Sequence, residues 1–240
     1  MTSDPISGAF ALDETGSVSK LYCEQSTPRI ENIFTLPAAY EGAAVAADAQ
    51  WVYVSSNTQL GCTVFRYSLL DKSVSHRLLN TGGPCDGIAT DGTAVYVALP
   101  YRSEINYLTS WEAPSHRSWD IGGAQGAETL VYDRIWKCLI VTDHHGRAFA
   151  VATSNGVVTK LATDLGVVRA VASSRQHVLL ASGTKVLALA RADSRVEKSP
   201  PVSLQFLTGG RISGITVDGN DRVWLNDCDK KLVEGPIPIS

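Results

Sequence analysis

The sequence predicts an all-β protein, a β-propeller made of repeated antiparallel sheets, and the main observation behind this is a recurring acidic turn. An Asp precedes a short apolar, β-branched run about every 42 residues along the chain. The turn residues are Asp48, Asp91, Asp133 and Asp218, and Ser174 fills the place between the last two, which are two periods apart. Several short strands per unit at this period are typical of a propeller.

The run after each acidic turn supports the same prediction. These runs are rich in Val, Ile, Leu and aromatic residues, which favours strands. They cover residues 51–55, 95–99, 138–142, 178–182 and 223–226, and a weaker copy at 18–22 follows Asp13. We expect glycines to carry the chain from the outer strand of one blade to the inner strand of the next. The glycines in question are 82–83, 122–123, 166 and 209–210.

The repeats set the number of blades. Complete units span residues 40–83, 84–123, 124–166 and 167–210, and the two ends (1–39 and 211–240) supply the remaining strands. The ends can form two separate blades, giving six, or share one blade, giving five. Division of the 240 residues by the period favours six blades of four antiparallel strands. We expect the N- and C-terminal segments to pair and close the ring, because an open ring leaves sheet edges unpaired.

The composition limits the class of protein and its partners. The chain is 44% hydrophobic and 19% charged, as in ordinary globular proteins, and no linker breaks it, so residues 1–240 form one expected domain. The net charge is −3 with scattered Lys and Arg, which predicts neither nucleic-acid binding nor membrane binding. There is no apolar run of membrane-spanning length and no secretory signal at the start.

The cysteines point to a reducing, cytoplasmic setting. There are five, with no C-x-x-C pair, so the sequence indicates neither a zinc site nor a disulfide framework. Cys138 lies in an apolar run and is predicted to be a small buried hydrophobe.

Propeller geometry predicts which polar residues gather at the central channel. The first strand of each unit lines the channel, and the loop after the second strand returns to the same mouth. Aligned repeats place Glu41, Asp86, Glu128, Arg169 and Arg211 or Ser213 at the start of the first strands. The returning loops add Asn57, Tyr101, Arg102, Asp143, His144, His145 and Asp227.

The carboxylates of this set could hold a metal. Ca²⁺ and Mg²⁺ prefer oxygen ligands on a rigid frame, so Glu41 and Asp86 are the candidate metal ligands. The alternative is structural: the two residues cap turns or form ion pairs with Arg169 and Arg211 inside the channel.

The other members suggest acid–base chemistry and ligand contacts. An imidazole can be an acid, a base or a ligand near neutral pH, so His144 joins Glu128 and Arg169 as candidate catalytic residues. The alternative for His144 is a polar hairpin turn closed by Gly146. The candidate substrate-binding residues are Tyr101, Arg102, Arg211 and Asp227, although Tyr101 and Arg102 can equally form a solvated loop.

Two repeats carry a family resemblance. PCDGIATDGTAVYVA and RISGITVDGNDRVWLN are similar to the repeat of six-bladed propellers grouped around gluconolactonase/regucalcin, NHL repeats, strictosidine synthase and streptogramin lyases. EGAAVAADAQWVYVS resembles the opening strand of the lactonase group. The resemblance implies a Glu on an opening strand and an Asp in a P-D-G strand as metal ligands, residue types that Glu41 and Asp86 match. The lyase resemblance implies a His and a Glu near Mg²⁺.

These observations lead to two hypotheses for function. The first is a small-molecule enzyme at the channel mouth, lactonase-, lyase- or cyclase-like, using Ca²⁺ or Mg²⁺ and no nucleotide or redox cofactor. The chain has no G-x-S-x-G turn, phosphate-binding glycine loop or H-E-x-x-H motif. The alternative is a non-catalytic propeller that binds a ligand or a protein partner. A multivalent lectin is disfavoured, because the polar mouth residues differ between repeats.

Overall fold

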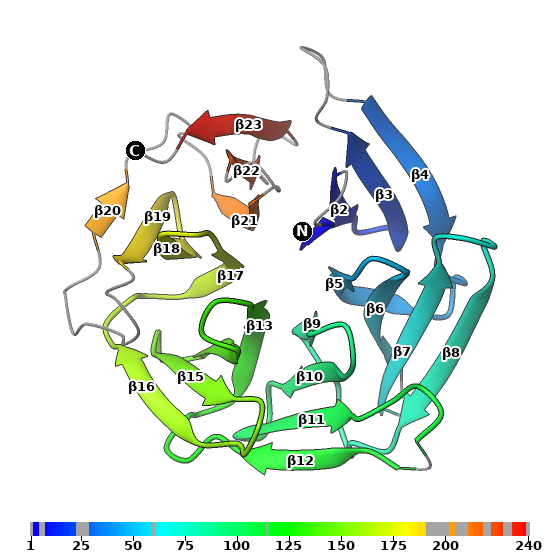
Figure 1. Ribbon diagram of the computed structural model, residues 1–240, viewed down its shortest axis with the longest axis horizontal. Coiled ribbons are helices and arrows are strands. Elements are labelled where there is room, and N and C mark those ends of the chain that lie inside the picture. Colours follow the sequence, from blue (N-terminus) through cyan, green and yellow to red (C-terminus); the bar gives the residue numbers. More distant parts are fainter. Residues whose placement is uncertain are drawn as a thin grey trace.

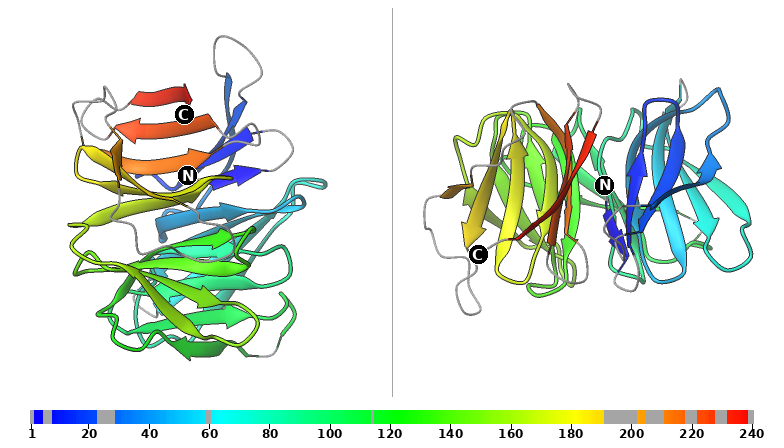
Figure 2. Two further views of the ribbon diagram at one scale, coloured as in Figure 1. Left: turned by 60° about the vertical axis from the view of Figure 1, so that its left-hand side comes forward. Right: turned by 90° about the horizontal axis from the view of Figure 1, so that it is seen from above.

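The computed structural model shows antiparallel β-sheets arranged in a ring around a central channel (Figure 1). Seen from the side, the strands run between the two faces of the ring (Figure 2). The structure describes residues 2–4, 8–22, 29–58, 61–113, 115–190, 202–204, 211–217, 222–227 and 232–238. Within these ranges no helix is long and apolar enough to cross a membrane.

Each sheet is formed by consecutive strands. The first sheet contains β1 (Thr2–Asp4), β2 (Gly8–Leu12), β3 (Ser17–Tyr22) and β4 (Arg29–Thr35). The second contains β5 (Glu41–Ala47), β6 (Trp51–Thr58), β7 (Gly61–Ser68) and β8 (Val74–Leu79). The third contains β9 (Ile88–Thr90), β10 (Val95–Leu99), β11 (Glu104–Leu108) and β12 (Arg117–Asp120). The fourth contains β13 (Ala127–Asp133), β14 (Cys138–Asp143), β15 (Ala148–Ala152) and β16 (Val158–Ala162). The fifth contains β17 (Val168–Ser173), β18 (His177–Ser182), β19 (Lys185–Ala190) and β20 (Val202–Leu204), and the last contains β21 (Ile212–Val217), β22 (Arg222–Asp227) and β23 (Leu232–Pro238).

The blade count and the ring closure differ from the main prediction. Among the described strands there are five four-stranded blades and one three-stranded sheet, β21-β22-β23, and the two ends lie in separate sheets and do not share a blade. Six blades of four strands each are therefore not formed in this part of the chain. Closure by pairing of the two ends is also wrong for the described strands. The N-terminal strand β1 pairs with β2, and β21, β22 and β23 pair only with one another; β1 lies against β5 and β21 without pairing with either.

The recurring acidic residues form the turns between the first two strands of the units. Asp48 Oδ1 accepts hydrogen bonds from the N–H groups of Gln50 (2.8 Å) and Trp51 (2.9 Å). An Asp side chain that bonds the backbone two and three residues ahead stabilises a tight turn. Asp91, Asp133 and Ser174 form the same turn, and Asp218 lies outside the described residues. Asp13 differs: it lies between β2 and β3, the second and third strands of its sheet, and accepts from the N–H groups of Thr15 and Ser17, two and four residues ahead. The sequence period is therefore a period of hairpin turns.

The hydrophobic core lies in the joints between neighbouring blades. Leu139 and Val141 of one blade pack with Ile105 of the previous blade in a fully buried cluster. The tryptophans that follow the acidic turns help fill these joints. Trp224 is buried, and Trp51 and Trp136 are partly buried against their clusters.

A cation–π contact adds to the joint between the second and third sheets. The Arg66 guanidinium lies 4.0 Å from the ring centre of Trp51 and 4.5 Å from that of Trp111. The Trp111 ring, which follows β11, therefore reaches across to the preceding blade.

A disulfide corrects the cysteine prediction. Cys62, in β7, and Cys85, in the segment before β9, form a disulfide with a Cα–Cα distance of 5.4 Å. Ring geometry brings together two cysteines 23 residues apart on adjacent blades, and no sequence spacing marks the pair. Cys138 is buried, as predicted, and Cys23 and Cys228 lie outside the described residues. The cytoplasmic location stays a prediction, although disulfides are rare in reducing compartments.

Candidate functional site

A repeated irregularity at the start of the inner strands sets which side chains reach the channel. In four of these strands, β5, β13, β17 and β21, the pairing with the next strand skips one residue. The skipped residues are Ala43, Glu128, Arg169 and Ser213. A β-bulge of this kind leaves the extra residue unpaired and changes its direction.

The third sheet has an equivalent arrangement at Asp86. The Asp86 N–H donates to the Ala98 carbonyl (3.1 Å), and the Ala98 N–H donates back to the Gly87 carbonyl (2.9 Å). Asp86 and Gly87 therefore both oppose Ala98, so Asp86 matches the skipped residue of the other sheets. The five residues form what we call the mouth ring: Ala43, Asp86, Glu128, Arg169 and Ser213.

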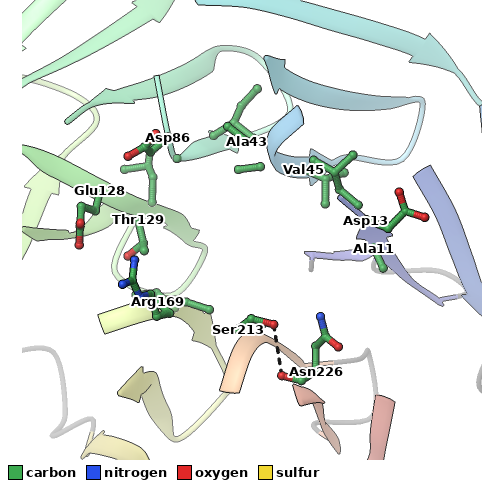
Figure 3. Close-up of a pocket in the computed structure, with 18 of the residues that line it drawn as sticks. Ala11, Asp13, Ala43, Val45, Asp86, Glu128, Thr129, Arg169, Ser213 and Asn226 are labelled. Atoms are coloured by element: carbon green, nitrogen blue, oxygen red, sulfur yellow. Dashed lines mark hydrogen bonds between the residues drawn. The ribbon is translucent and has the colours of Figure 1, made fainter. Parts of the chain in front are cut away.

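The mouth ring lines a cavity of about 690 Å³ in the channel, and Figure 3 shows its members around this space. Side chains such as Val45, Leu130 and Val168 give the wall apolar sections. Because every member comes from a different blade, the cavity has a different chemical group on each side. It is a single asymmetric site.

The repeat alignment placed three ring residues correctly, left the last position open between Arg211 and Ser213, and was wrong at Glu41. Asp86, Glu128, Arg169 and Ser213 all line the cavity. Glu41 does not, because the bulge in β5 falls two residues later and brings Ala43 to the axis. Glu41 is instead an exposed residue at the first position of β5.

The predicted metal ligands are therefore not assembled around this cavity. Asp86 lines it and Glu41 does not. In the described part of the chain, no group of three or more His, Cys, Asp or Glu side chains could hold a metal ion. The Ca²⁺ or Mg²⁺ cofactor stays a prediction, and Asp86 is the one proposed ligand that faces the cavity.

His144 lies behind the ring and is held from both sides. Its Nδ1 is 2.6 Å from Glu128 Oε1, and its Nε2 is 2.8 Å from the Pro100 carbonyl oxygen. Both partners are acceptors, so only the imidazolium form donates to both. Burial opposes the charge, but the Pro100 carbonyl and the Glu128 carboxylate outweigh it and raise the pKa of His144. His144 is not among the residues that line the cavity.

The surroundings of Asp86 destabilise its charged form, whereas those of His144 stabilise the charged form. Burial raises the pKa of this carboxyl, and repulsion by Glu128 adds to the effect, while His144 and Arg169 act against it. Among the described residues no group donates a hydrogen bond to the Asp86 carboxylate, and no direct ion pair joins it to Arg169. Asp86 thus faces the cavity as an unpaired acidic group.

We expect His144→Gln to destabilise the protein more at pH 5.5 than at pH 9. The folded-state pKa is raised, so the stabilisation is complete below the unfolded value of about 6.5 and is lost as pH rises through the folded value. The His144 side chain is 43% exposed, so we expect less than about 1 kcal/mol. Urea unfolding across this pH range measures the effect, with His145→Gln as the neighbouring control. Equal losses at both pH values would contradict it.

Three of the four predicted substrate contacts lie away from the cavity. Tyr101 is 80% exposed, Arg102 lies 3.9 Å from Glu104, and Arg211 is exposed. Asp227 ends β22, where it pairs with Ile212 of β21. Tyr101, Arg102 and Arg211 do not line the cavity, and the side chain of Asp227 is outside the described part of the structure.

Sequence reasoning missed Asn226, which lines the cavity and has its amide in view in Figure 3. The repeat alignment named the last residue of β22 and passed over the residue before it. Successive positions of a strand alternate between its two faces, and this alternation is the signal that could have pointed to Asn226.

Comparisons with known proteins show the fold. No protein-family model and no curated protein matches this sequence. A chain in the crystal structure of a nidogen/laminin complex aligns with a TM-score of 0.78 and 17% identity, over 93% of this chain and 86% of that one. A chain in the crystal structure of a mitotic checkpoint complex aligns with a TM-score of 0.69 and 8% identity, over 98% of this chain and 88% of that one.

The protein is a β-propeller. At these identities the likeness extends to the fold alone. The predicted fold class is confirmed, and the narrower resemblance to the lactonase, NHL, strictosidine synthase and lyase group stays a prediction.

Proposed function

We propose that this propeller is a non-catalytic interaction module that takes a segment of a partner protein into the cavity at the mouth ring. The observation that carries the proposal is the division of the charged groups there. Glu128 and His144 are bound to each other. Asp86 and Arg169 face the same cavity without a direct partner among the described residues. The Glu128–His144 pair gives the wall a fixed shape, and the unpaired charges of Asp86 and Arg169 can bind charged groups of a partner.

The structural neighbours agree with this proposal. Both were solved within protein complexes, one named for nidogen and laminin and the other for the mitotic checkpoint. The cavity of about 690 Å³ has the size of a small-ligand site, which can hold a few residues of a polypeptide. The asymmetric ring favours one bound segment per propeller.

The enzyme hypothesis requires a proton-transfer group that the site does not offer at His144. A general base needs an unprotonated nitrogen within reach of its substrate. Both His144 nitrogens are occupied by acceptors, and its raised pKa favours the protonated form. Lactonase, lyase or cyclase chemistry would therefore have to use a carboxylate that lines the cavity, such as Asp86 or Glu128.

A channel plug tests the proposal. Ala43 is exposed within the channel, so Ala43→Trp obstructs part of the cavity without displacing a core residue. Ala49→Trp, at an exposed turn position outside the cavity, is the matched control. We expect a random peptide display library to yield binders of the native protein that Ala43→Trp no longer binds and Ala49→Trp still binds.

Two results would count against the module. Binders that are unaffected by the Ala43→Trp plug would show that the channel is not the binding site. Turnover of lactones or esters that is lost in Glu128→Gln would favour the enzyme hypothesis. Circular dichroism of each variant checks that the fold is retained.

A further inference from the structure

The charged side chains around the cavity distinguish between possible occupants. Four carboxylates line it, on Asp13, Glu14, Asp86 and Glu128. Arg169 is the only cationic side chain among the described residues that line it. A bound segment therefore contacts both negative and positive side chains in the cavity, and its own charges determine its affinity.

Arg169 is available to an acidic group. It is the bulged residue of β17, its side chain is exposed to the cavity, and Figure 3 shows the guanidinium beside Thr129. Among the described residues it forms no hydrogen bond or direct ion pair; its interaction with Asp86 is electrostatic only. A planar guanidinium binds a carboxylate through two parallel hydrogen bonds, which makes this the preferred occupant.

Asp86 is available to a basic group. Its carboxylate is partly buried beside Glu128, so it lacks solvation and is repelled by a like charge. A cation placed against it compensates for both effects. Glu128 is less available, because one of its oxygens already accepts from His144 and the other is buried.

An occupant with a single charge would pair with only one of the two groups, Asp86 or Arg169. An occupant with only a carboxylate would bind Arg169 beside the negative groups Asp86 and Glu128. An occupant with only a cation would bind Asp86 within the field of Arg169, which acts on that carboxyl. Ser213 and the Asn226 amide add neutral polar groups to the same cavity.

We propose that the mouth ring selects a polypeptide segment that carries one acidic and one basic side chain close together, the acidic one bound by Arg169 and the basic one by Asp86. This inference rests on the proposed function. It adds the chemistry of the partner segment.

Fluorescence anisotropy with four capped glycine-based pentapeptides tests the inference. The first peptide carries lysine and aspartate, the second norleucine and aspartate, the third lysine and asparagine, and the fourth norleucine and asparagine. We expect the first to bind best and each single neutralisation to weaken binding about tenfold or more, as for charged pairs in protected sites.

Variants of the protein assign each charge to its partner. Arg169→Gln should weaken the lysine–aspartate peptide and leave the lysine–asparagine peptide unchanged, and Asp86→Asn should discriminate in the converse way. Arg175→Gln, in the turn after β17, and Asp164→Asn, in the loop before it, remove the same charges outside the cavity and should have no effect. The free lysyl-aspartate dipeptide is the small-molecule arm and should compete weakly.

The outcomes separate this inference from the proposed function. Equal affinity for all four peptides, or no coupling to Asp86 and Arg169, would overturn the charge-pair inference. If the library still yields plug-sensitive binders in that case, the interaction module stands with a different partner chemistry. Direct binding of the free dipeptide, measured by calorimetry, while none of the capped peptides binds would overturn both in favour of a small zwitterionic ligand.

Discussion

Replacement of Asp133 by Ala is expected to destabilise the protein by about 3–5 kcal/mol, because three hydrogen-bond donors lose a buried acceptor. Asp133 is fully buried. Its Oδ1 accepts from the N–H groups of Ile135 (2.9 Å) and Trp136 (2.8 Å), and its Oδ2 accepts from Ser173 Oγ (3.0 Å) on the next blade. One carboxylate therefore holds both a turn and a joint between blades. Urea unfolding followed by tryptophan fluorescence measures the loss.

Asp91→Ala is the matched control for Asp133→Ala. Asp91 forms the same turn with Thr93 and Ala94, but it is only partly buried and its second oxygen bonds Tyr96 within its own sheet. We expect a smaller loss of about 1–2 kcal/mol. Equal losses in the two variants would show that the contact between blades adds nothing to the turn.

Gly126→Ala is expected to cost about 2–4 kcal/mol, because it combines a strained backbone with a steric clash. Gly126 has a φ of +76°, and an added Cβ would meet the Pro100 carbonyl oxygen and the His144 ring. The clash displaces His144 from the position in which it donates to Glu128. We therefore expect the variant to lose stability in urea unfolding and to lose most of the pH dependence assigned to His144.

Gly123→Ala separates the clash from the backbone effect. Gly123 has a φ of +84°, and its added Cβ would meet nothing within 4 Å. Only the conformational cost applies, about 1 kcal/mol. If Gly123→Ala is as costly as Gly126→Ala, the contact with Pro100 and His144 is not what requires glycine at position 126.

The strands and turns could be predicted from the sequence because they depend on local contacts. The Asp91 side chain bonds the N–H groups of Thr93 and Ala94, and β10 follows at the predicted residues. The glycines predicted between blades lie between β8 and β9, between β12 and β13, and between β16 and β17; those at 209–210 lie outside the described residues. Such interactions span a few residues, so the sequence of a single repeat is enough to predict its strands and turns.

The site was only partly predictable, since the position of a bulge is not local information. Alignment found Asp86, Glu128 and Arg169, but it placed Glu41 at the axis where the structure has Ala43. Side chains alternate between the two faces of a strand with a period of two. A bulge that moves by two residues therefore leaves the pattern of apolar and polar residues in the sequence unchanged.

The sequence by itself determined the all-β class, the repeat and the turns of this protein. Tertiary structure alone decided the Cys62–Cys85 disulfide, the pairing of β1 inside the first sheet, and the His144 contact with Glu128 and Pro100. The disulfide and the His144 contacts join residues that are distant in sequence. The pairing of β1 is one of several that its local sequence permits. The physical reason is that they depend on how the blades approach one another around the ring, and that approach is fixed only when the joints between them are packed.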